Sequence, residues 1–127
     1  MYDRPPQTFA ELFSPFPEEI SELGKEARNR IRLALPEAEE RVYGGKKVGN
    51  VLYSVDRPNN VLCGIQPGET FIRVFFHQWE ILKQAGYPVE GTGKNARHVK
   101  IKRLADFDEI DLAKMVSLVS KNARRVN

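Results

Sequence analysis

The sequence predicts a single α+β domain in which an N-terminal and a C-terminal helix pack on one face of an antiparallel sheet of about five strands. Apolar residues recur with helical spacing near both ends of the 127-residue chain, and β-branched and aromatic residues cluster in short runs between them. The turn sequences that separate these runs are short. Short connections favour antiparallel hairpins over parallel crossovers.

Proline and helical periodicity define the N-terminal elements. Residues 1–7 are rich in proline and polar side chains, and they are expected to form a flexible lead-in to a helical turn over 8–13. A Ser-Pro-Phe-Pro breaker follows, and the segment 18–35 then has the apolar spacing of an amphipathic helix. Acidic residues come first in this segment and arginines last, as the helix dipole favours, before Pro36 ends it.

The middle of the chain alternates as strands do, and a second helix follows. The expected strands cover residues 42–43, 48–55, 61–65, 70–76 and 98–104, with Gly, Asn and Pro in most of the connections. Asp108, with Asp111 three residues on, is the predicted N-cap of a final amphipathic helix that reaches Ala123. The ordered core of the single domain (residues 1–127) is thus expected to span about 8–123, and residues 124–127 a tail.

Composition excludes several classes of protein. Charged residues make up 29% and hydrophobic residues 41% of the chain, which is ordinary for a folded soluble domain and unlike a disordered one. No apolar run reaches the roughly 18–20 residues of a membrane helix, and the N-terminal residues lack the pattern of a secretory signal. The one cysteine, Cys63, precludes an internal disulfide, so a cytoplasmic location is expected. Its apolar surroundings predict a buried hydrophobe and not a nucleophile.

The charge balance permits an anionic partner without requiring one. Lysine and arginine number 20 against 17 aspartate and glutamate, a net charge of +3, and residues 64–127 hold this excess. Non-specific nucleic-acid binders usually carry a denser basic stripe, so charge alone argues against a nucleic-acid partner.

The segment 86–98 carries the most unusual chemistry in the sequence. Its glycines expose backbone N–H groups, and basic residues follow them at once, which together make a reasonable anion site. A Walker A loop is excluded, because Asn95 follows the Gly-Lys pair and Pro88 stands where the first glycine belongs. The alternative is an ordinary surface turn that enters a basic strand. The candidate anion-contacting residues are Gly91, Thr92, Gly93, Lys94, Arg97 and His98.

The same segment resembles a known signature. Glu-Gly-Thr-Gly-Lys-Asn-Ala-Arg-His-Val-Lys, residues 90–100, is similar to the signature of the YdhG-like family, bacterial domains of mostly unassigned activity. Weaker similarity covers the segments 35–45, 71–77 and 108–123, so the resemblance extends over about residues 8–123. Two departures stand out: Trp79 replaces a frequent glycine, and Gly-Lys replaces the usual Met-Pro after Tyr43-Gly44.

The resemblance implies little about activity, so a non-catalytic binding or adaptor domain is expected. One family member is described as a frataxin-like iron chaperone, which is the first alternative, and iron in transit prefers carboxylate oxygens. Glutamates spaced four apart on the first long helix and aspartates before the last helix qualify as ligands. Both groups also suit ion pairing along a helix and helix capping. The candidate iron ligands are Glu18, Glu22, Glu26, Asp106, Asp108 and Asp111.

Aromatic residues supply the remaining hypotheses. Tyr43 and Trp79 are candidates for the mouth of a pocket, because an aromatic at a strand exit often borders a ligand. Aromatics on the strands could also stack nucleobases, which makes single-stranded nucleic-acid binding the second alternative, although such residues usually belong to the core. No catalytic residue and no cofactor are expected, apart from iron under the first alternative. The expected partner is a small anion or a protein, with no membrane, and the chain is expected to be a monomer or a homodimer.

Overall fold

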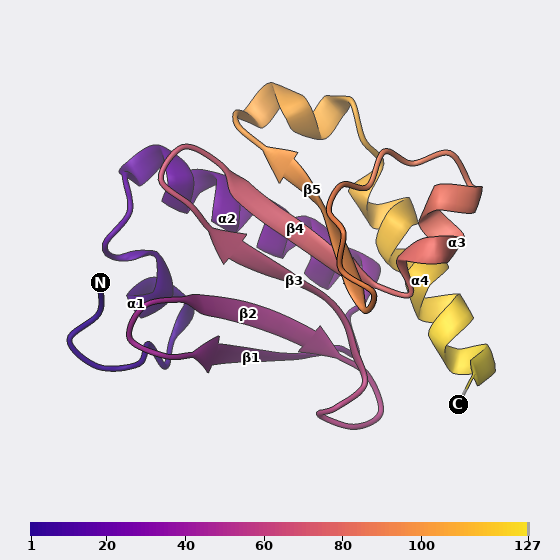
Figure 1. Ribbon diagram of the computed structural model, residues 1–127, viewed down its shortest axis with the longest axis horizontal. Coiled ribbons are helices and arrows are strands. Elements are labelled where there is room, and N and C mark those ends of the chain that lie inside the picture. Colours follow the sequence, from indigo (N-terminus) through magenta and orange to yellow (C-terminus); the bar gives the residue numbers. More distant parts are fainter. Residues whose placement is uncertain (127) are drawn as a thin grey trace.

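The computed structural model describes residues 1–126, and the side chains of residues 1–123. In that part of the chain, helices lie at both ends and the strands lie in the middle (Figure 1). The elements in order are α1 (Phe9–Phe13), α2 (Glu18–Ala34), β1 (Glu39–Gly44), β2 (Gly49–Ser54), β3 (Val61–Pro67), β4 (Ile72–His77), α3 (Trp79–Gln84), β5 (Ala96–Ile101), a 3-10 helix η1 (Leu104–Asp108) and α4 (Leu112–Val126).

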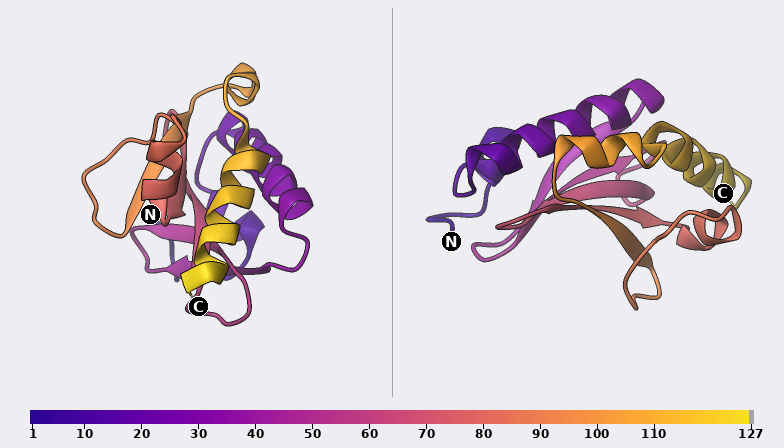
Figure 2. Two further views of the ribbon diagram at one scale, coloured as in Figure 1. Left: turned by 90° about the vertical axis from the view of Figure 1, so that its right-hand side faces the viewer. Right: turned by 90° about the horizontal axis from the view of Figure 1, so that it is seen from above.

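The five strands form an antiparallel meander. Each strand pairs with the next one along the chain, so the spatial order is β1-β2-β3-β4-β5. Helices α2, η1 and α4 lie on one side of this sheet, as the right-hand view of Figure 2 shows. The predicted α+β class, with terminal helices on one sheet face, is therefore confirmed.

The core lies between the sheet and these helices. Alternate residues of each strand point to the helical side, and β4 shows this directly, because Ile72, Val74 and Phe76 are fully buried while the residues between them are only half-buried. Helix α2 buries a stripe with helical spacing that includes Ile20 and Ile31. The predicted periodicities of both element types account for this packing.

The bounds of every predicted strand differ from the sequence prediction: β1 covers Glu39–Gly44 instead of 42–43, and the bounds of β2, β3 and β4 differ by one or two residues. Strand β5 covers Ala96–Ile101 instead of 98–104, because η1 begins at Leu104 and its Asp106 carboxylate accepts the backbone N–H of Lys102 at 2.8 Å. Helix α3 follows β4 directly, where no helix was predicted. The predicted N-cap Asp108 is wrong: Asp111 holds that position, since its carboxylate accepts the backbone N–H of Lys114 at 3.1 Å and α4 begins at Leu112.

The terminal segments are more ordered than the sequence predicts. The expected lead-in is tied down, because the Tyr2 hydroxyl donates to the Leu12 carbonyl at 2.7 Å and Pro6 is buried. At the other end the backbone of α4 continues to Val126, within the expected tail, while Asn127 lies outside the described residues. None of the helices described has the length and apolarity that crossing a membrane requires.

Candidate functional site

The face of the sheet opposite α2 and α4, hereafter the open face, presents two rows of side chains. Strand register places the residues of each row side by side, from β1 to β5. The first row is Arg41, Leu52, Gly64, Phe75 and His98. The second row is Tyr43, Asn50, Gln66, Arg73 and Lys100. The open face is thus cationic and aromatic toward β4 and β5.

Two cations lie together in the second row. Arg73 and Lys100 are cross-strand partners, and both approach the ring of Phe71: the Arg73 Cζ lies 4.9 Å and the Lys100 Nζ 5.0 Å from the ring centroid. In the described part of the chain, no carboxylate forms an ion pair with either side chain. Both positive charges therefore lie within 5.0 Å of the centre of one aromatic ring, whose face attracts cations.

Phe75 lies at the centre of the first row. A Cβ on Gly64 would come within 2.2 Å of Phe75 Cζ, so the end of the ring rests directly on the backbone of β3. Only glycine admits this approach, because any larger residue would push the ring away from the sheet. Because Gly64 has no side chain, the Phe75 ring lies against the sheet on the open face, where it is half-buried.

His98 is the cross-strand neighbour of Phe75 on β5. Burial lowers the pKa of its imidazole, and the positive charges of Arg73 and Lys100 lower it further, while Glu90 opposes them. Its Nε2 is buried and has no hydrogen-bond partner among the described residues. The imidazole is therefore neutral near pH 7, and it has hydrogen-bonding capacity that the protein itself does not use.

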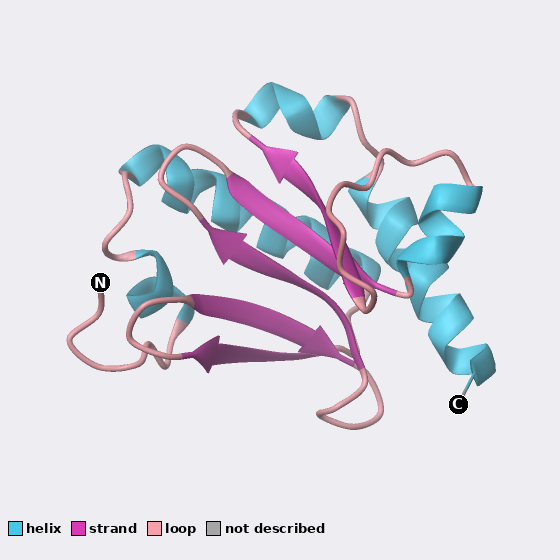
Figure 3. Cartoon of the chain, viewed as in Figure 1, coloured by secondary structure: helices cyan, strands magenta, loops and turns pink. Residues whose placement is uncertain are grey.

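The loop 85–95 borders the open face beside β5 (Figure 3). Glu90 and His98 exchange two backbone hydrogen bonds of 2.7 and 3.0 Å, so the loop pairs briefly with the free edge of β5. Gly91 then takes a φ of +108°, which favours glycine, and lies against the His98 ring. The remaining predicted loop residues, Thr92, Gly93 and Lys94, are exposed.

Arg97 has a structural role in this loop. Its guanidinium carbon lies 3.6 Å from the centroid of the Trp79 ring, and its Nε donates to the Gly93 carbonyl at 3.3 Å. The Trp79 indole N–H donates to the Lys94 carbonyl at 2.9 Å. The six predicted anion-contacting residues thus separate: His98 joins the open face, Lys94 remains free at its border, and Arg97 holds the loop to α3.

The two candidate pocket-mouth aromatics are not brought together. Tyr43 lies on the edge strand β1, with 63% of its surface exposed, whereas Trp79 begins α3 after β4. Two strands, β2 and β3, separate β1 from β4 in the sheet. Tyr43 belongs to the open face, and Trp79 belongs to the loop contact described above.

The candidate iron ligands occupy ordinary positions. Glu22 forms an ion pair with Lys25 and Glu26 one with Arg30, each at 3.8 Å, as their helical spacing predicts, and Glu18 lies exposed in the first turn of α2. Asp106 and Asp111 accept backbone N–H groups, and Asp108 lies exposed in η1. Within the described residues, no three His, Cys, Asp or Glu side chains gather where they could hold a metal ion.

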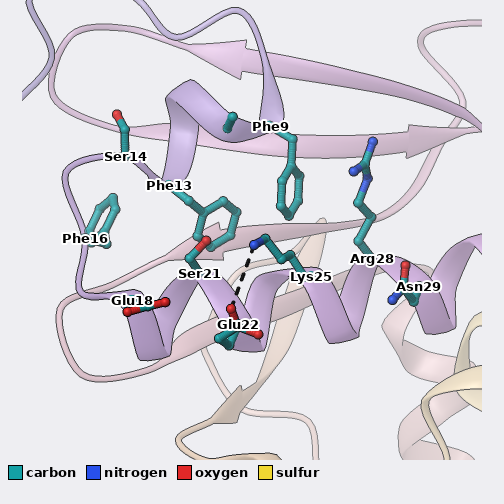
Figure 4. A pocket seen from close by; sticks show the side chains of 11 residues that line it. Phe9, Phe13, Ser14, Phe16, Glu18, Ser21, Glu22, Lys25, Arg28 and Asn29 are labelled. Carbon is teal, nitrogen blue, oxygen red and sulfur yellow. Dashed lines mark ion pairs between the residues drawn. The ribbon is translucent and has the colours of Figure 1, made fainter.

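A hollow of about 710 Å³ lies between α1 and α2 (Figure 4). The rings of Phe9, Phe13 and Phe16 line one side of it, and polar side chains of α2 line the other. The cations in this lining already have partners: Lys25 pairs with Glu22, and Arg28 pairs with Glu40. The hollow is therefore less suited to an anion than the open face is.

One group of interacting residues has only a weak signal in the sequence. The Glu40 carboxylate accepts two hydrogen bonds from Arg28, at 2.8 and 2.7 Å, and one from the Tyr53 hydroxyl at 2.7 Å. This network joins α2 to β1 and β2. Its one trace is that the strand alternation directs Glu40 toward the helices, where a carboxylate requires partners.

The structure thus defines a small α+β domain with one helix-covered sheet face and one exposed, cationic and aromatic face. Comparison of the chain with protein-family models, with curated proteins and with solved structures finds no significant match in any of the three. The resemblance of the loop 85–95 and β5 to the YdhG-like family therefore stays a prediction from the sequence.

Proposed function

We propose that this protein is a non-catalytic binding domain that holds an anionic partner on the open face of its sheet. The observation that carries the proposal is the juxtaposition of Arg73 and Lys100 at one aromatic ring, without a carboxylate counterion in the described residues. A bound anion would offset the repulsion between these cations, and would accept charge-assisted hydrogen bonds from both.

The surroundings of the two cations support the same proposal. The exposed Lys94 lies on the bordering loop and adds a third cation at the border of the open face. In the described part of the chain, no nucleophilic side chain and no carboxylate is hydrogen bonded to the His98 imidazole. The arrangement therefore supports recognition of charge better than general base catalysis, which pairs an imidazole with such groups.

A thermal-shift assay with pyrophosphate tests the proposal. At about 100 times its dissociation constant, a specific ligand stabilises the folded state by about 2.7 kcal/mol, which raises the melting temperature by several degrees. We expect this shift in the wild type and its loss in the variant Arg73→Ala/Lys100→Ala. The matched control is Lys114→Ala/Lys121→Ala, which removes two exposed lysines of α4 on the other side of the sheet.

Three results would overturn the proposal: no shift with pyrophosphate, equal shifts in the wild type and the open-face variant, or a loss of the shift in the α4 control as well. An anaerobic arm with ferrous iron belongs in the same assay. A shift with iron and none with pyrophosphate would favour the iron-chaperone alternative instead. Circular dichroism of each variant shows whether its fold is intact.

A further inference from the structure

We infer that the anionic partner of the open face is a single-stranded nucleic acid, whose bases stack on the exposed rings while its phosphates contact the cations. This inference rests on the proposed function and adds the class of partner to it. Single strands present phosphates and unpaired bases in alternation, so a surface that binds them combines cations with aromatic rings. The open face has both kinds of group within the same two rows.

The rings are placed for stacking. Phe75 lies at the centre of the face and rests on the backbone of Gly64, between Leu52 on one side and His98 on the other. Tyr43 is 63% exposed at the β1 end of the second row. Each ring lies on a strand of the sheet, and an aromatic side chain has only two χ angles to fix when a base stacks on it.

A further cation lies near Arg73 at the end of the sheet. Lys100 and Arg73 are cross-strand partners, and Arg73 also lines a hollow of about 250 Å³ together with Lys47 of the β1–β2 connection. The cations therefore extend from β5 to a hollow at the end of the sheet, which Tyr2 and Phe16 also line. Glu69 is the one carboxylate that borders this hollow. A track of separated cations matches a chain of phosphates better than it matches one small anion.

The shape of the face favours a single strand over a duplex. A duplex is read by an element that enters its groove, usually a helix or a two-stranded ribbon. The open face is instead a sheet surface, with rings that can stack only on bases that are already unpaired. The loop 85–95 borders this face on the β5 side, where Gly91 lies against the His98 ring, while Lys100 and Tyr43 are exposed.

Fluorescence anisotropy with a labelled 12-nucleotide oligouridylate tests the inference, with inorganic polyphosphate of matched charge as competitor. We expect Phe75→Leu to weaken oligouridylate binding at least about fivefold, which is the lower end of the effect of losing one stacked base. Polyphosphate binding should be unchanged by the same substitution. Lys100→Gln should instead weaken both ligands, and should reduce the salt dependence of oligouridylate binding by the equivalent of about one phosphate contact.

Two further variants keep the test decisive. Tyr43→Ala removes an exposed ring at no cost to the core, so it is expected to fold and to weaken oligouridylate binding even if Phe75→Leu does not fold. Phe9→Leu changes a half-buried ring on the helical side, and should leave the affinity unchanged.

The outcomes separate this inference from the proposed function. Equal binding of oligouridylate and polyphosphate, with no effect of Phe75→Leu or Tyr43→Ala, would overturn the inference and leave the anion-binding proposal standing. Tighter binding of a duplex than of a single strand would also overturn it. Failure of both ligands to bind would contradict both proposals.

Discussion

At the scale of single residues, Glu40 is held by three hydrogen bonds from two side chains. Its partial burial opposes ionisation, but hydrogen bonds from Arg28 and Tyr53 outweigh this effect and hold the pKa of the carboxyl below its ordinary value. Burial, together with this neighbouring carboxylate, raises the pKa of Tyr53 far above its ordinary value. The network therefore joins an ionised Glu40 to a neutral Tyr53 hydroxyl.

Removal of this carboxylate is expected to destabilise the protein. Glu40→Ala leaves the Tyr53 hydroxyl and the Arg28 guanidinium without their partner, and should lower the free energy of unfolding by about 2–3 kcal/mol. Glu40→Gln retains a hydrogen-bond acceptor and should cost less. Urea unfolding measures both values, and a Glu40→Ala variant within about 0.5 kcal/mol of the wild type would contradict this view.

The lowered pKa values of the two histidines allow a prediction of how the stability of the fold changes with pH. Burial lowers the pKa of His77, and burial together with Arg73 and Lys100 lowers that of His98, whereas Glu90 opposes this. The unfolded chain therefore binds protons more readily, so stability should fall as the pH drops below about 6.5. His98→Gln should show a smaller fall between pH 7 and pH 5 in thermal unfolding. A fall identical to that of the wild type would exclude a contribution from His98.

At the scale of elements, α3 connects the loop 85–95 to the rest of the domain. Gln78 takes a positive φ of 57° between β4 and α3, and its side chain accepts a hydrogen bond from Asn122 of α4 at 2.7 Å. Trp79 then holds the loop through its indole N–H and its stacking on Arg97. The loop 85–95 is thus positioned by a side chain of α3, a helix that the sequence pattern did not predict.

Loss of the Arg97 side chain is expected to loosen this loop. Arg97→Ala removes the stacking on Trp79 and the bond to Gly93, which together should be worth about 1 kcal/mol locally. Hydrogen exchange of the paired amides of Glu90 and His98 should then become faster. Lys94→Ala is the matched control, because Lys94 takes part through its carbonyl and not its side chain, and it should leave that exchange unchanged. Equal exchange rates of these amides in the two variants would show that the Arg97 side chain does not hold the loop.

At the scale of the whole molecule, the fold class followed from local chemistry. Helical spacing, strand alternation and turn residues act over a few positions, so they predicted the meander and both terminal helices correctly. Helix α3 was not predicted because its six residues are too few for a periodic pattern and because its N-cap, Gln78, is not a capping residue type, unlike Thr8 before α1. The shift of the α4 N-cap from Asp108 to Asp111 depended on the preceding η1, which the sequence did not indicate.

The candidate site was only partly predictable. The motif residues are contiguous in the sequence, but strand geometry turns Arg97 and His98 to opposite sides of β5. Arg73 was not among the sequence candidates, because it joins Lys100 only through the register of β4 with β5. The burial of Cys63 could be predicted without knowledge of the strand pairing, because the residues around it are apolar. Cys63 is fully buried, and this burial raises the pKa of its thiol to about 12.

The most direct test of the central claim is a nuclear magnetic resonance titration with pyrophosphate, which locates binding residue by residue. We expect the largest changes in amide chemical shift at Arg73, Phe75, His98 and Lys100, and only small changes along α2 and α4. Changes concentrated at the hollow between α1 and α2, or no saturable changes at all, would contradict the assignment of the open face as an anion-binding surface.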